Sequence, residues 1–92
     1  MSWPRLTGVR ITVLYFAALR EIAGMAEVTL EVPAAVTTVG ALARHLEAEV
    51  AGLAGRLGSV RFAKNEEFVD PDATLDEGDV VALIPPVAGG AV

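Results

Sequence analysis

The chain has 92 residues, of which 53% are hydrophobic and only five are aromatic, so it can form one small domain whose core consists mainly of aliphatic side chains. Its formal charge of -5, from 12 acidic and seven basic residues, argues against nucleic acid as a partner, because such binding relies on clustered lysine and arginine. The absence of cysteine excludes disulfide bonds, thiolate metal sites and a cysteine nucleophile.

The N-terminal part predicts a leader followed by a strand. Residues 1–8 contain Pro4 and Gly8 and show no periodicity, so we expect a loose leader there. From residue 9 to residue 16 the side chains alternate between two faces, which is typical of a strand. The first face carries Val9, Ile11, Val13 and Tyr15, and the second carries Arg10, Thr12, Leu14 and Phe16.

The apolar run within this region, residues 11–19, is nine residues long and is followed at once by Arg20 and Glu21. A membrane-spanning helix needs about 20 apolar residues, and the run lacks the small-residue cleavage site of a signal peptide. We therefore expect a cytoplasmic protein that does not use a membrane.

A second strand and one long helix follow. Residues 17–24 suit a short helical turn or loop, and residues 27–32 alternate valine or leucine with polar residues, which predicts a half-exposed strand paired with the first. Thr37 or Thr38 can cap a helix that runs to about Val50. Its apolar residues recur at helical spacing: Val39, Leu42, Ala43, Leu46 and Val50.

The remaining chain predicts three more extended segments. Glycines interrupt residues 52–58, after which residues 60–64 suit a strand, residues 65–67 a turn and residues 68–69 a short edge. An acidic turn at residues 76–79 precedes a strand at 80–84 that is apolar on both faces. The order of elements predicts an α+β fold, the ubiquitin-like β-grasp, in which a mixed sheet of four to five strands packs on one main helix over residues 9–84.

Residues 85–92 form a tail with a distinctive composition. Pro85 and Pro86 favour an extended start, and the glycines at 89 and 90 have no Cβ to hinder entry into a narrow pocket. Together with the segments Val13–Glu21, Lys64–Val69 and Leu75–Ile84, the Pro-Pro and Gly-Gly pairs make the chain resemble the MoaD family of ubiquitin-like sulfur carriers, the small subunits of molybdopterin synthase. The ThiS carriers of thiamine synthesis are closely related.

The resemblance implies a chemical role for the tail. Gly90 would be adenylated by an E1-like adenylyltransferase that uses ATP, and then converted to a thiocarboxylate whose sulfur builds the dithiolene of molybdopterin inside the large subunit. Pro85, Pro86 and Gly89 would thread the tail into these partners. Phe16, Phe68 and Ile84 match family positions whose side chains face the partner.

Ala91 and Val92 depart from this pattern, because they place the terminal carboxylate beyond Gly90. Two extended residues displace it by about 7 Å, and about 1 Å of misplacement already costs a hundredfold in rate. We therefore expect a peptidase to trim the chain after Gly90. A simpler explanation is that the two residues do not belong to the natural tail.

The sequence is also compatible with other functions. The chain could carry sulfur for thiamine or another metabolite, modify target lysines through an isopeptide bond, or act as an interaction domain with an inert tail. We expect no metal site, because Gly78 within Asp76–Asp79 indicates a turn, and His45 lacks catalytic neighbours in the sequence. Four basic residues are expected to be solvated surface charges: Arg10, Arg20, Arg61 and Lys64.

Overall fold

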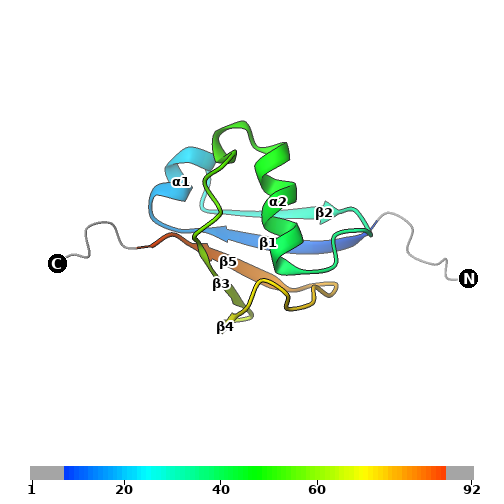
Figure 1. The fold of residues 1–92 in the computed structure, drawn as a ribbon. Coiled ribbons are helices and arrows are strands. Elements are labelled where there is room, and N and C mark those ends of the chain that lie inside the picture. The colour runs from blue at the N-terminus through cyan, green and yellow to red at the C-terminus, as the bar shows by residue number, and fades with distance from the viewer. Residues whose placement is uncertain (1–7, 87–92) are drawn as a thin grey trace, which may run out of the picture.

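The computed structural model describes residues 8–86, so the leader before Gly8 and the tail after Pro86 lie outside the described residues (Figure 1). No helix in residues 8–86 is long and apolar enough to cross a membrane. The elements in chain order are β1 (Val9–Tyr15), α1 (Ala18–Ala23), β2 (Glu27–Val32), α2 (Val39–Glu49), the 3-10 helix η1 (Ala51–Leu53), β3 (Arg61–Lys64), β4 (Glu67–Val69) and β5 (Val80–Ile84).

The strands form one mixed sheet in the order β2-β1-β5-β3-β4. β1 and β5 run parallel, with Tyr15 opposite Leu83, and the other three neighbouring pairs are antiparallel. The last strand therefore lies beside the first, in the middle of the sheet. A five-stranded mixed sheet with one main helix confirms the predicted β-grasp.

Figure 1 shows α1 and α2 on the same side of the sheet, and the hydrophobic core lies between them and the strands. Alternation in the strands supplies one half of the core, because every second side chain of β1 and β5 points toward α2. The helix supplies the other half through four buried residues at helical spacing. The side chains that are fully buried in this core include Ile11, Val13, Leu42, Leu46, Val81 and Leu83.

The helix α2 begins where its sequence predicts. Thr38 has extended backbone dihedrals, and its Oγ1 accepts a hydrogen bond of 3.1 Å from the amide of Ala41, so Thr38 rather than Thr37 is the N-cap. The helix ends one residue early, at Glu49. Val50 follows with extended dihedrals and packs against the core as a half-buried side chain.

Three local features differ from the sequence-based expectations. The β3–β4 turn has two residues instead of three, Asn65 and Glu66, whose φ angles of 52° and 75° suit a tight hairpin, and Glu67 already belongs to β4. The segment after α2 contains the unpredicted η1. Gly8, which we placed in the leader, is buried, and a Cβ on it would overlap the carbonyl oxygen of Val32.

A polar network holds the acidic turn before β5. Asp79 is 8% exposed, and its carboxylate accepts hydrogen bonds from the Asp76 amide at 2.8 Å and from Asn65 Nδ2 at 3.0 Å. Lys64 Nζ lies 3.9 Å from the same carboxylate and donates to the Thr74 carbonyl at 2.8 Å. Lys64 is therefore part of the structure of this turn and not only a solvated charge.

The network predicts the effect of removing its central carboxylate. Asp79→Ala leaves the Asp76 amide and the Asn65 side chain without their acceptor, so we expect the free energy of unfolding to fall by about 2 kcal/mol in urea denaturation. Asp72→Ala, at an exposed position in a neighbouring turn, is the matched control and should change this free energy by less than about 0.5 kcal/mol. Equal losses in the two variants would contradict the role given to Asp79.

Candidate functional site

The face of the sheet that points away from the helices carries the candidate site. Directly paired residues share a face, so the register places a row of side chains across four strands. Leu14 of β1 pairs with Ala82 of β5. On the other side of Ala82 lies Ala63 of β3, which in turn pairs with Phe68 of β4. We call this the outer face and define it by Leu14, Phe16, Ala63, Phe68, Ala82 and Ile84.

The centre of the outer face is a hollow of about 590 Å³. Two alanines, Ala63 and Ala82, lie at adjacent strand positions there, and their small side chains leave the space that larger residues would fill. Ala82, which the alternation predicts to face outward, does so but is only 7% exposed. The hollow is lined by Leu14, Phe16, Ala63, Asn65, Glu66, Val80, Ala82 and Ile84.

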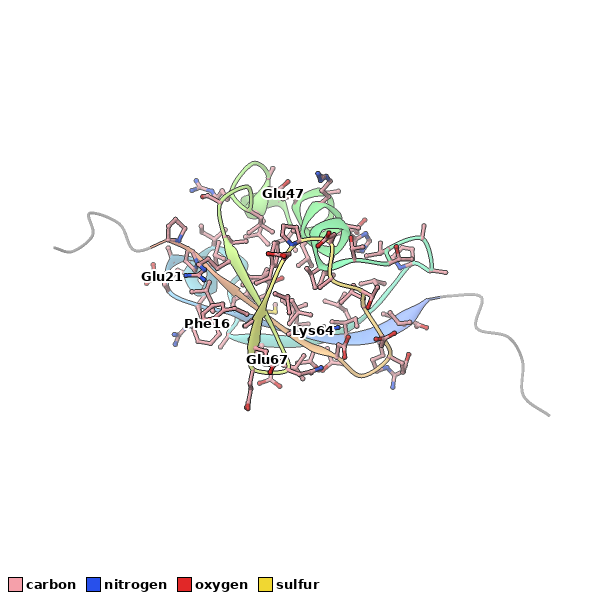
Figure 2. All side chains as sticks on the ribbon, turned by 60° about the horizontal axis from the view of Figure 1, so that its bottom comes forward. Phe16, Glu21, Glu47, Lys64 and Glu67 are labelled. Carbon is pink, nitrogen blue, oxygen red and sulfur yellow. The ribbon has the colours of Figure 1, made fainter. Side chains whose placement is uncertain are left out.

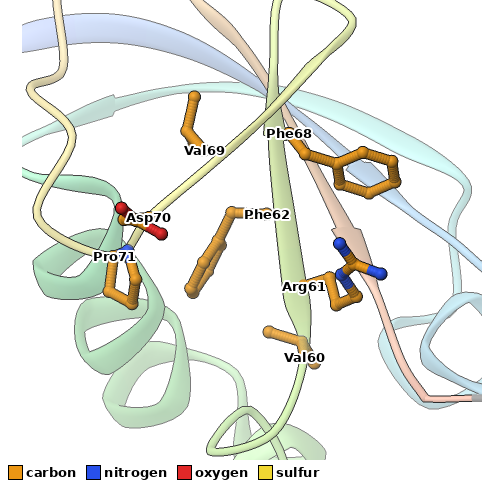
Figure 3. Close-up of a pocket in the computed structure, with 7 residues that line it drawn as sticks. All are labelled: Val60, Arg61, Phe62, Phe68, Val69, Asp70 and Pro71. Carbon is orange, nitrogen blue, oxygen red and sulfur yellow. The ribbon is translucent and has the colours of Figure 1, made fainter.

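Phe68 stands at the rim of this face beside a cation. Its ring is 61% exposed, and the guanidinium carbon of Arg61 lies 4.4 Å from the ring centroid. Figure 3 shows Arg61 and Phe68 on one side of β3 and Phe62 on the other side. Such stacking holds the guanidinium over the ring while its N–H groups can still reach a partner. Arg61 was expected to be a solvated charge, and the structure shows that it also contacts an aromatic ring.

Phe16 and Ile84 lie close to the point where the sheet gives way to the tail. Phe16 directly follows β1, is 41% exposed, and its amide donates to the Leu83 carbonyl at 3.3 Å (Figure 2). Ile84 is half-buried and pairs with Arg61. The three residues expected to contact a partner, Phe16, Phe68 and Ile84, thus share one face, although Phe68 lies at its rim and not in the hollow.

The tail begins at the end of a strand paired on both sides. β5 stops at Ile84 because Pro85 has no N–H with which to continue the ladder. Pro85 is half-buried and Pro86 is exposed. The remaining tail residues of interest, Gly89, Gly90, Ala91 and Val92, lie outside the described residues.

Several other polar and titratable residues lie apart from the hollow. Glu77 Oε1 accepts a hydrogen bond from the Arg10 amide at 3.0 Å, which ties the acidic turn to β1. His45 lies on α2, facing β2. Burial raises the pKa of the Tyr15 phenol above its usual value, so this group is neutral at pH 7. Across residues 8–86 no three metal-ligating side chains come together.

The sequence predicts the exposed aromatic residues Phe16 and Phe68, but it does not predict the hollow on the same face. Leu14, Ala63 and Ala82 meet only through the register of β1, β5 and β3. A signal was present in the alternation of β3, because Ala63 shares a face with Arg61 and not with the buried Phe62. The hollow combines mainly apolar side chains with Asn65 and Glu66, a composition that suits contact with another protein.

The chain is similar to curated proteins over most of its length. It is 42% identical over 84 residues to the molybdopterin synthase sulfur carrier subunit of Chlamydomonas reinhardtii, with 89% of this chain and 100% of that protein covered. It is 41% identical over 87 residues to the small archaeal modifier protein 3 of Haloferax volcanii, with 83% of this chain and 94% of that protein covered.

Solved structures share the fold. The solution structure of a Haloferax volcanii protein matches with a TM-score of 0.76 and 40% identity, covering 89% of this chain and 87% of that one. A chain from the complex of subunits 1 and 2 of the molybdopterin-converting factor of Helicobacter pylori matches with a TM-score of 0.62 and 26% identity, covering 89% and 100%. The family model of the ThiS family matches residues 13–90, and the chain therefore belongs to the ThiS family.

Proposed function

We propose that this chain is a sulfur carrier of molybdenum cofactor biosynthesis and serves, in the cytoplasm, as the small subunit of molybdopterin synthase. The observation that carries the proposal is the 42% identity to the Chlamydomonas reinhardtii sulfur carrier subunit over the whole of that protein. The family match adds support at the tail, because it ends at Gly90 and leaves Ala91 and Val92 beyond it.

In this proposal the carboxylate of Gly90 is the reacting group. An E1-like adenylyltransferase joins it to the AMP part of ATP and releases pyrophosphate, and a hydrosulfide equivalent then displaces AMP to leave a thiocarboxylate. The adenylate is needed because a free carboxylate has no good leaving group. Glycine suits the step because it has no Cβ to obstruct the attacking sulfur.

The described residues contribute binding and positioning. The outer face offers an apolar hollow to the large subunit, with Phe16 in its lining and Phe68 at the rim of the same face. The Pro-Pro pair starts the tail in an extended direction from the end of β5. Docking of the outer face therefore fixes the place from which the tail enters the active site of the partner, and such positioning supplies part of the acceleration.

The two residues after Gly90 require a processing step. With Ala91 and Val92 in place the terminal carboxylate belongs to valine and is displaced by about 7 Å from a site shaped for Gly90. We infer that a peptidase removes them before activation.

A second candidate function has support from one relative. The 41% identity to small archaeal modifier protein 3 favours a ubiquitin-like modifier whose terminal glycine is joined to lysine side chains of targets. Both functions use an adenylated Gly90 and differ in the nucleophile that follows. High-mass conjugates in cell extracts that disappear when Gly90 is deleted would favour the modifier.

The proposal predicts a strict dependence on the last glycine. A chain that ends at Gly90, incubated with the activating enzyme, ATP and sulfide, should gain the mass that corresponds to replacement of one oxygen by sulfur. Chains that end at Gly89 or at Val92 should not gain it, because their carboxylates are misplaced. Intact-protein mass spectrometry measures the gain. Unfolding curves provide the control, since all three chains share the described fold and should differ by less than about 0.5 kcal/mol. Thiocarboxylate on the untrimmed chain would refute the trimming step.

The proposed role of the outer face predicts how substitutions on it change the affinity for the large subunit. Phe16→Ala and Phe68→Ala should each weaken binding to the large subunit about tenfold in calorimetric titration, because exposed aromatic side chains that become buried in an interface contribute much of its affinity. Met25→Ala is the matched control: Met25 is 44% exposed, close to the value for Phe16, but it lies beside α2 and not on the outer face. If the control weakened binding as much as the two phenylalanine variants, the interface would have to be placed elsewhere.

A further inference from the structure

Within residues 8–86, the edge strand β2 presents backbone groups that no other strand uses. The sheet order ends at β2, and the Tyr15 amide donates to the Ala26 carbonyl at 2.8 Å, which fixes the alternation of the β1–β2 ladder. By that alternation Val28 and Leu30 exchange hydrogen bonds with β1. The N–H and C=O groups of Glu27 and Thr29 therefore point away from the sheet, in the direction of an additional strand.

An apolar groove lies directly beside this edge. It has a volume of about 290 Å³ and runs between β2 and α2, on the opposite side of the sheet from the outer face. The groove exists because Val28 and Leu30 point toward the helix from the outermost strand, where the helix covers them only in part. Its apolar lining includes Met25, Val28, Leu30, Leu46 and Val50.

The charged side chains near the edge are mainly acidic, although Arg10 of β1 lies directly opposite Glu31. Glu49 and His45 line the groove, and Glu31 borders it as well. On the opposite side of β2 the alternation places the side chains of Glu27 and Glu31, with Thr29 between them. A strand added beside β2 would thus have an apolar groove on one of its sides and two carboxylates on the other.

This charge pattern selects against a second copy of the chain. An antiparallel pair of β2 strands centred on Thr29 would set Glu27 of one copy opposite Glu31 of the other, and like charges directly opposite each other destabilise a sheet. The other sheet edge is a weaker template, because β4 has three residues and Pro71 follows closely. A segment with lysine or arginine at alternate positions would instead meet opposite charges.

We propose that the edge of β2 and the adjoining groove bind an extended segment of a partner protein in which apolar and basic residues alternate. The segment adds a sixth strand to the sheet through the backbone groups of Glu27 and Thr29. Its apolar side chains enter the groove, and a basic side chain lies beside Glu27. The groove lies on the opposite side of the sheet from the outer face, whereas Glu27 borders the outer face through its pairing with Leu14.

The test uses the full 92-residue chain, labelled with ¹⁵N, and a capped peptide of sequence Gly-Lys-Ile-Lys-Val-Lys-Gly. We expect saturable shifts of backbone amide signals with a Kd below about 1 mM, largest along β2 and around Val50. Two control peptides isolate the pattern: Gly-Lys-Lys-Lys-Ile-Val-Gly keeps the composition without the alternation, and Gly-Glu-Ile-Glu-Val-Glu-Gly reverses the charge. Each should bind at least about tenfold more weakly, because it loses either the two-sided fit or the opposite-charge pairs.

A pair of protein variants tests the backbone contact. Thr29→Pro removes the N–H that the added strand requires but no bond of the β1–β2 ladder, and it should weaken binding about tenfold. Thr29→Val keeps that N–H while removing the hydroxyl, whose Oγ1 lies 3.0 Å from Thr12 Oγ1, and should bind within about twofold of the original chain. If Thr29→Pro fails to fold, Glu27→Lys takes its place and should weaken binding at least about threefold.

Three results would overturn the proposal. The first is the absence of binding at millimolar peptide. The second is equal binding of the alternating peptide and either control peptide, and the third is a shift pattern centred on Phe16 and Phe68 instead of β2. Equal binding by the original chain and the Thr29→Pro or Glu27→Lys variant would also exclude addition of a strand at this edge.

Discussion

The position of β5 in the middle of the sheet determines where the functional parts of this protein lie. β5 is hydrogen-bonded to β1 on one side and to β3 on the other, so its direction is fixed along its whole length. The parallel pairing with β1 needs a long connection, and the chain provides it through β2, α2 and the β3–β4 hairpin. Because Pro85 ends the ladder, the tail leaves from the most constrained strand of the domain.

The two faces of the sheet differ in what covers their apolar side chains. The face toward α2 buries Val81, Leu83 and their neighbours and accounts for the stability of the fold. The outer face carries apolar side chains as well, yet no described element covers them. Folding gains little from an apolar ring left in water, so the exposure of Phe16 and Phe68 supports the proposed contact with a partner.

The sequence predicts the elements well because their signals are local. Alternation identifies β1 and β2, and helical spacing with a threonine cap identifies α2. The hollow at Ala63 and Ala82, the Arg61–Phe68 contact and the Lys64–Asp79 network could not be predicted, since they depend on the register between strands far apart in the chain. The groove beside β2 depends likewise on how far α2 extends over the sheet. The resemblance of the tail rests on residues 85–90, most of which lie outside the described residues.

Charged side chains around the outer face bear on the orientation in which a partner would bind. The row that crosses the hollow has Glu27 at its β2 end, opposite Leu14, and Arg61 stacked on Phe68 at its other end. A partner seated on the apolar hollow would have Glu27 on one side and Arg61 on the other, with Glu66 in the lining, so these charges distinguish between its two orientations. Such complementarity selects an orientation more than it adds affinity. Arg61 also pairs with Ile84, so the orientation that charge selects is coupled to the strand end from which the tail departs.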